Sequence, residues 1–108
     1  MKKLIFISSP YRGKVQENVA LAKDLCRYVM GEGHIPVAPH LFFPQFLDDS
    51  KDDERDAGMD GSLELLARCD ELWLFGGKIT DGMRLEMEEA IKLGKPMSVL
   101  RIEQEDTP

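Results

Sequence analysis

The sequence has few cysteines and no long apolar run, and each lack excludes a class of protein. Cys26 and Cys69 are the two cysteines among 108 residues, and they lack the spacing of metal ligands, so we expect buried thiols. No apolar run approaches the ~18 residues that span a bilayer. Lys2 and Lys3 precede only a short apolar run, below the ~7–15 residues of a signal-peptide core. We therefore expect a cytoplasmic protein with no membrane partner.

Basic charge and phosphate-binding signatures are also lacking. Lysine and arginine number 14 against 20 acidic residues, which gives a formal net charge of −6. Because phosphate neutralisation supplies most of the affinity for long nucleic acid, such a partner is not expected, although one nucleotide in a local pocket is compatible with this charge. Neither the P-loop nor the Gly-x-Gly-x-x-Gly fingerprint is present. The first predicted strand also ends without the carboxylates that a phospho-receiver domain needs.

Short apolar runs alternate with helical patterns along the chain. The runs are typical of strands buried on both faces, and they lie at residues 3–8, 34–38, 71–75 and 97–102. Apolar residues at helical spacing predict helices over 15–30, 60–68 and 82–93, before a frayed polar tail at 103–108. This order predicts one α/β domain over 1–108, a flavodoxin-like or Rossmann-like three-layer sandwich with a parallel sheet of four to five strands.

Residues 41–58 are the least regular part of the pattern. The segment opens with the apolar run Leu41 to Leu47, where a fifth strand could lie, and then turns acidic from Asp48 to Asp56. A structureless loop this long is functional or mobile, so we expect a partly helical segment that covers a pocket as a lid. A solvated charge run is favoured over a metal site on these aspartates. The next helix is expected to begin at an N-cap formed by Asp60 or Ser62.

Polar residues follow the predicted strands at the edge where parallel sheets bind ligands. After the first strand come Ser8, Ser9, Pro10, Tyr11, Arg12 and Gly13, and after the second come Pro39 and His40. Backbone N–H groups at a helix start attract anions, and Arg12 could add a bidentate contact to phosphate, although a plain strand-to-helix turn is the alternative. For His40 a structural role is favoured over a catalytic one. Because the opposite edge carries little beyond helix-ending glycines, the sequence predicts a ligand site on this edge.

The turn into the last predicted helix carries a second candidate site. Thr80 or Asp81 can cap this helix. Glu86 lies about 80° from the centre of the apolar arc that includes Met83 and Ile91, which places it at the edge of the core face. A carboxylate there can face the crevice between the strands, and an ordinary boundary glutamate is the alternative.

Several stretches, in this order, resemble a known family. They run from Phe6 to Gly13, Ala38 to His40, Cys69 to Gly76, Gly82 to Glu86 and Leu93 to Pro96. The chain resembles the nucleoside 2-deoxyribosyltransferase-like superfamily, which includes 2′-deoxynucleoside 5′-monophosphate N-glycosidases. It looks most similar to an uncharacterised, DUF4406-like branch. The resemblance covers nearly the whole chain and implies the same α/β fold.

The resemblance also implies a reaction and a set of site residues. Glu86 falls on the family's nucleophile, which attacks the anomeric carbon as in a retaining glycosidase, before transfer to another base or to water. The loop 8–13 falls where the sugar or 5′-phosphate is held. The other candidate ligand-binding residues are His40, Ser62, Thr80, Asp81, Gly82 and Met83. The resemblance implies no metal and no other cofactor, a nucleoside or nucleotide as partner, and a homodimer or higher homo-oligomer.

Two departures from the family pattern leave a second interpretation open. Phe6 stands where family enzymes carry a tyrosine that orients the glutamate, and Tyr11 is a candidate substitute. Ser62 stands where they carry an aspartate, with Asp60 two residues earlier. We therefore expect either a nucleoside deoxyribosyltransferase or nucleotide N-glycosidase, or an inactive nucleotide-binding or sensing module of the same fold, with an unrelated α/β function as the remaining alternative.

Overall fold

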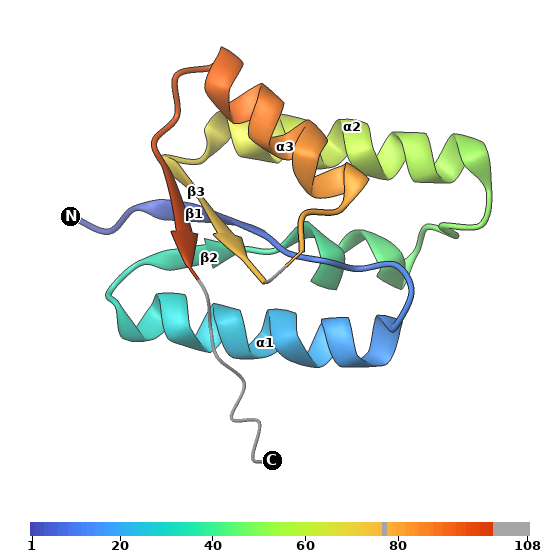
Figure 1. Cartoon of the computed structure of the whole chain (residues 1–108), viewed down its shortest axis with the longest axis horizontal. Helices are drawn as coiled ribbons and strands as arrows, with labels where there is room; N and C mark the ends of the chain where they lie inside the picture. The colour runs from blue at the N-terminus through green and yellow to red at the C-terminus, as the bar shows by residue number, and fades with distance from the viewer. Residues whose placement is uncertain (77, 101–108) are drawn as a thin grey trace.

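The computed structural model describes residues 1–76 and 78–100, and in them four parallel strands form one sheet (Figure 1). The strands are β1 (Leu4–Ser8), β2 (Ile35–Val37), β3 (Glu71–Phe75) and β4 (Met97–Leu100), in the order β2-β1-β3-β4. No fifth strand occurs in this part of the chain, because the apolar run after β2 forms two short 3-10 helices, η1 (Pro39–Leu41) and η2 (Phe43–Gln45). The remainder of the last predicted strand, 101–102, and the predicted tail at 103–108 lie outside the described residues.

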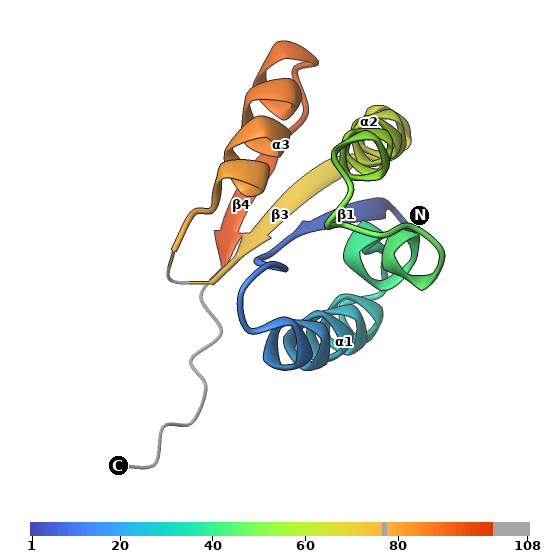
Figure 2. The ribbon, with the colours of Figure 1, turned by 90° about the vertical axis from the view of Figure 1, so that its right-hand side faces the viewer.

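Three helices cover the two faces of the sheet. Helix α1 (Val15–Gly31) lies on one face, and α2 (Asp52–Arg68) and α3 (Asp81–Lys92) lie on the other (Figure 2). The side chains buried between the sheet and α2 and α3 are Phe6, Leu66, Cys69, Leu72, Leu74, Met83 and Ala90. Those buried towards α1 are Ile5, Ile7, Leu25, Val29 and Phe75. The predicted three-layer α/β sandwich is therefore confirmed.

Strand β1 is central, and its pairing fixes where the crevice of the sheet lies. It pairs with β2 on one side and with β3 on the other, where Ser8 lies opposite Leu74. The connection from β1 to β2 passes through α1 on one face, and the connection from β2 to β3 passes through α2 on the opposite face. The reversal of direction at β1 and β3 makes their carboxyl ends the switch point at which such sheets bind ligands.

Helix α2 begins earlier than the sequence pattern predicted. It starts at Asp52 with Lys51 as N-cap residue, so the N-cap predicted at Asp60 or Ser62 is wrong, and Ser62 is buried in the middle of the helix. Acidic residues fill the first turn, where carboxylates are favoured by the helix dipole. The acidic run is thus the start of a helix, which confirms that part of 41–58 is helical. Its role as a lid stays a prediction.

The predictions of buried cysteine thiols and of no membrane-spanning segment can be compared with the fold. Cys69 is buried and Cys26 is half-buried, and neither forms a disulfide. Burial, aided by the neighbouring Asp70 carboxylate, raises the pKa of the Cys69 thiol to about 11. Among the helices of residues 1–76 and 78–100, none has the length and apolar character needed to cross a membrane.

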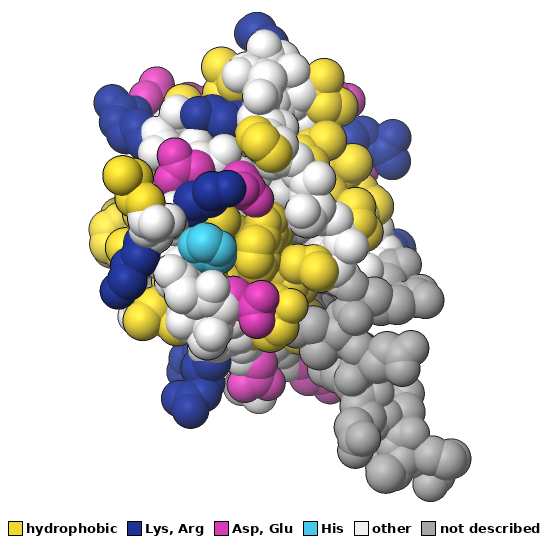
Figure 3. Space-filling model, turned by 90° about the vertical axis from the view of Figure 1, so that its left-hand side faces the viewer, with side chains coloured by type: hydrophobic (Ala, Val, Ile, Leu, Met, Phe, Trp, Pro, Cys, Tyr) yellow, Lys and Arg dark blue, Asp and Glu magenta, His cyan; other side chains and the backbone are white. Residues whose placement is uncertain are grey.

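The edge of the sheet opposite the switch point is more polar than the sequence suggested, as Figure 3 shows for that side of the molecule. Lys3 donates to Glu71 at 2.7 Å, and the Trp73 indole donates to the same carboxylate at 3.0 Å. The ring of His34 packs edge-on against Trp73. These groups bond to one another, which is typical of a structural cluster rather than of a ligand site.

A glycine of α2 lets the segment after β2 approach the helix closely. A β-carbon at Gly61 would lie 2.6 Å from Cζ of Phe43, which is far inside van der Waals contact. At Gly58, on the same helix, a β-carbon would lie 3.5 Å from Cδ1 of Leu47, which is an ordinary contact. The position of the Phe43 ring therefore depends on the missing side chain at Gly61.

We expect opposite effects from alanine at these two glycines. Gly58→Ala raises the free energy of unfolding by about 0.5–1 kcal/mol, because alanine favours the helix and meets no obstacle. Gly61→Ala shows no such gain, because the Phe43 ring must move. Urea denaturation of both variants beside the wild type measures the difference. Equal stabilisation by the two substitutions would show that the ring does not constrain Gly61.

Candidate active site

The carboxyl group of Glu86 is more deeply buried than the sequence predicted. The buried side chains of α3 are Met83, Glu86 and Ala90, so the glutamate belongs to the buried stripe of the helix. Glu86 is 1% exposed, whereas Ile91, which was expected to face inwards, is 64% exposed. That expectation for Ile91 is wrong because α3 packs against α2 as well as the sheet, which moves its buried face towards Glu86.

Local sequence explains how α3 presents this residue. The helix begins after Thr80, whose hydroxyl accepts a hydrogen bond from the Met83 N–H at 3.2 Å, as the sequence predicted for a cap at Thr80 or Asp81. The cap sets the start of the helix at the carboxyl edge of the sheet. Glu86 then lies in the second turn, over the end of β1.

The partner of Glu86 is Ser8, the last residue of β1. Phe6 packs towards α2 and α3, and side chains alternate along a strand, so Ser8 points to the same face. Its hydroxyl donates to Oε1 of Glu86 at 2.6 Å, and this hydrogen bond is buried. The sequence placed Ser8 in the ligand-binding loop, whereas in the structure Ser8 holds the glutamate.

Burial and this hydrogen bond act in opposite directions on the acidity of Glu86. Loss of solvent raises the pKa of the carboxyl group to about 7, and the bond from Ser8 opposes the rise. The group therefore changes its protonation state near neutral pH. A carboxyl group with such a pKa can both give and accept a proton at physiological pH.

Neither Phe6, at the position of the family's orienting tyrosine, nor Tyr11, the candidate substitute, bonds to Glu86. Phe6 is buried in the core and has no hydroxyl. The ring of Tyr11 stacks on His40, with centroids 5.2 Å apart and planes 24° apart. The hydroxyl beside the glutamate is therefore that of Ser8. A second hydroxyl, Oγ of Ser9, is buried and has no hydrogen-bond partner among the described residues.

His40 is a half-buried side chain of η1, and its lowered imidazole pKa favours the neutral form. Burial lowers the pKa of its imidazole, against smaller opposing effects of a hydrogen bond with the Ser9 backbone and of the Asp49 carboxylate. With Tyr11 it forms a flat aromatic surface next to the switch point. A neutral stacked pair of this kind is suited to contact with a planar ring.

A cavity of about 430 Å³ opens at the same edge of the sheet, which is a size typical of small-molecule sites. The predicted site residues that line it are Tyr11, Arg12, His40, Ser62, Thr80, Asp81 and Gly82. The predicted residues that do not line it are Ser8, Ser9, Pro10, Gly13, Met83 and Glu86. The structure thus brings together the loops after β1, β2 and β3, with the Ser8–Glu86 pair behind the cavity wall.

Part of the cavity wall was missed by the sequence analysis. Phe43 and Asp49 come from the segment 41–58, and Arg55 and Met59 come from the first half of α2. Residues 55, 59 and 62 follow helical spacing and share one face of α2. That signal was present in the sequence, but it becomes visible only when the helix is extended back through the acidic run.

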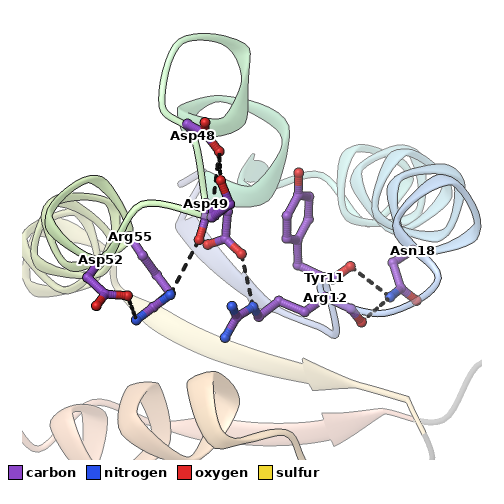
Figure 4. A network of polar contacts seen from close by, with 8 residues as sticks. Tyr11, Arg12, Asn18, Asp48, Asp49, Asp52 and Arg55 are labelled. Carbon is purple, nitrogen blue, oxygen red and sulfur yellow. Dashed lines mark hydrogen bonds and ion pairs between the residues drawn. The ribbon is translucent and has the colours of Figure 1, made fainter.

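Two arginines at the cavity are held by the same aspartate, as Figure 4 shows. Nε of Arg12 lies 2.9 Å from Oδ2 of Asp49, and Nη1 of Arg55 donates to the Asp49 carbonyl oxygen at 3.4 Å. Arg55 also pairs with Asp52 at 2.7 Å. The Asn18 amide donates to the carbonyl oxygens in the loop after β1 and holds that loop in place. Within the described residues, no group of three or more metal-ligating side chains is arranged to hold a metal ion.

The chain is similar to one domain family and to solved structures of the same fold. A model of a domain of unknown function, DUF7768, matches residues 3–100. Among solved structures, the chain is similar to a 2-deoxyribosyltransferase from the psychrotolerant bacterium Bacillus psychrosaccharolyticus, described as a biocatalyst for the synthesis of antiviral and antitumoral nucleosides. The TM-score is 0.73 at 19% sequence identity, over 91% of this chain and 72% of that chain. No curated protein matches.

The structural likeness confirms the α/β fold that the sequence predicted. At 19% identity it shows the fold alone, so the role of Glu86 and the reaction stay predictions. The family match names DUF7768, and the DUF4406-like branch is not shown.

The raised pKa of Glu86 makes the free energy of unfolding depend on pH, and comparison with Glu86→Gln separates this effect from those of other groups. Above about pH 4.5 the unfolded chain releases this proton, whereas the native state keeps it until about pH 7. The free energy of unfolding of the wild type, relative to Glu86→Gln, is therefore expected to fall by about 3 kcal/mol as the pH rises through this window. Urea denaturation of both proteins at several pH values measures it. A difference that does not change with pH would contradict the burial of an ionisable carboxyl group.

Proposed function

The chain belongs to the DUF7768 family, and from its fold and the buried Ser8–Glu86 pair we propose that it cleaves or transfers the N-glycosidic bond of a (deoxy)nucleoside or its 5′-monophosphate. Glu86 is the proposed nucleophile. The observation that carries the proposal is the placement of one carboxyl group, with a raised pKa and a hydroxyl partner, at the switch point beside a cavity of small-molecule size. Carboxylates in dry sites beside ligand cavities are candidates for reactive groups.

The proposed reaction has two steps. The ionised carboxylate of Glu86 attacks the anomeric carbon, the carbon–nitrogen bond breaks, and its electron pair leaves with the base, which takes up a proton. Water or the nitrogen of a second base then attacks the glycosyl ester, loses a proton and frees the carboxylate. The hydroxyl of Ser8 supports the first step, because its hydrogen bond stabilises the ionised form of Glu86.

The cavity supplies complementary features for such a substrate. The stacked pair of Tyr11 and His40 offers a flat surface for the base. The first turn of α3, with Thr80 and Asp81, lines the same cavity and offers oxygen atoms to sugar hydroxyls. A sugar bound there lies beside the helix that carries Glu86.

A second candidate function is supported by the burial of the same residue. Glu86 is 1% exposed and does not line the cavity, so its carboxyl group must move, or the wall must open, before it meets a substrate. Phe6 also lacks the hydroxyl that family enzymes use to orient the glutamate. A nucleotide-binding or sensing module that keeps the cavity without the chemistry is therefore the alternative.

The proposal includes the finer expectations from the sequence. They are membership of a DUF4406-like branch, a cytoplasmic location, a lid role for 41–58 and assembly into a homodimer or larger homo-oligomer. Leu85 on α3 and Leu93 at its C-cap are 47% and 41% exposed, and this apolar surface supports the proposed assembly.

Base release separates the two functions. We expect the wild type to release or exchange a base from one or more members of a panel of ribo- and deoxyribonucleosides and their 5′-monophosphates, with and without a free acceptor base. Glu86→Gln is expected to lower the rate by about a thousandfold or more, because the nucleophile is lost. Chromatography of the free base measures the rate.

Glu88→Gln is the matched control, since Glu88 is an exposed glutamate on the same helix. It is expected to retain the wild-type rate. If a nucleoside or nucleotide binds and no base is released across the panel, the enzymatic proposal fails and the binding module stands. Base release that persists in Glu86→Gln would show that Glu86 is not the nucleophile.

A further inference from the structure

The charged side chains that line the cavity are mostly acidic. Asp49, Glu54, Asp56 and Asp81 supply four carboxylates, against the two guanidinium groups of Arg12 and Arg55. Among the described residues that line the cavity, the carboxylates thus outnumber the cations by two. A dianionic group placed in the cavity would meet this excess of like charge, which acts against binding.

Both arginines are already engaged by carboxylates of the chain. Arg12 pairs with the Asp49 carboxylate at 2.9 Å, and Arg55 pairs with Asp52 at 2.7 Å. The Asp49 carbonyl oxygen also accepts from Arg55, so one residue contacts both cations. The Asp49 carboxylate therefore occupies a position on Arg12 that the phosphate of a ligand would otherwise take.

The segment that carries Asp49 is held in this position by its neighbours. The Asp48 carboxylate accepts from the backbone N–H of Ser50 at 3.0 Å and from its hydroxyl at 2.6 Å. The backbone N–H of Asp48 in turn donates to Glu54 at 2.7 Å. These bonds join the segment to the first turn of α2, so the contact between Asp49 and Arg12 does not depend on one side chain alone.

The helix starts at the cavity carry their own negative charge. The N-terminal turn of a helix attracts anions, but the first turn of α3 contains Asp81, and that of α2 contains Asp52, Asp53 and Glu54. The cations and helix starts at this cavity are thus matched by carboxylates of the same chain. The cavity offers hydrogen-bond acceptors and an aromatic surface, which suit the hydroxyls of a sugar and a planar base.

We infer that the substrate of this site is the uncharged nucleoside rather than its 5′-monophosphate, and that Asp49 is a specificity-determining residue that excludes the phosphate from Arg12. This inference rests on the proposed function and narrows its substrate class. It concerns the recognition of the ligand, which a binding measurement tests separately from the chemical reaction.

The test compares the affinity of a nucleoside with that of its own 5′-monophosphate. Calorimetric titration of the wild type is expected to give a Kd for the nucleoside about tenfold or more below that for the monophosphate. Asp49→Asn removes the carboxylate from Arg12 and is expected to shift this ratio about tenfold towards the monophosphate. Asp24→Asn makes the same change in net charge at an exposed position of α1 that does not line the cavity, and it is expected to leave the ratio unchanged.

The outcomes separate this inference from the proposed function. A wild type that binds the monophosphate more tightly, or an unchanged ratio in Asp49→Asn, overturns the inference, and base release that depends on Glu86 would still uphold the proposed function. Preference for the nucleoside without base release upholds the inference and leaves the binding module as the function. If neither compound binds, both the inference and the proposed function are overturned.

Discussion

The hydrogen bond from Ser8 to Glu86 places a carboxyl group in the apolar layer between the sheet and the two helices that cover it. Burying such a group is costly unless it is hydrogen-bonded or protonated; Glu86 accepts a hydrogen bond from Ser8, and its raised pKa favours the protonated form below about pH 7. The bond requires the end of β1 and the second turn of α3 to meet at the switch point. They meet there because β1 is central in the sheet, because the Thr80 cap sets the start of α3, and because α3 packs against α2.

The sequence was sufficient for the fold because its signals are local and strong. Strand β3 and helix α1 were predicted almost to the residue, since a buried strand and a long amphipathic helix have distinct periodicities. The start of α2 was missed because its acidic first turn has no apolar stripe, although the helix dipole favours those charges. The site was predicted only in part, since the position of Ser8 beside Glu86 depends on how β1 and α3 pack, which no local pattern contains.

The cavity and the glutamate raise two separate questions. The lining of the cavity comes from the loops after three strands and from α2, and the charges of this lining bear on which ligand is bound. Glu86 lies behind the cavity wall with a pKa near neutrality, and its position bears on whether the ligand reacts. Likeness to a 2-deoxyribosyltransferase at 19% identity supports the fold that both share, and neither question is answered by fold alone.

The most direct test of the account is to detect the covalent intermediate that a glutamate nucleophile must form. Wild-type protein is mixed with a nucleoside that it accepts, quenched in acid within the first turnovers, digested and mapped by mass spectrometry. The account predicts a peptide containing Glu86 that is heavier by one glycosyl unit, and no such adduct in Glu86→Gln. Base release without an adduct on Glu86, or an adduct on another residue, would contradict it.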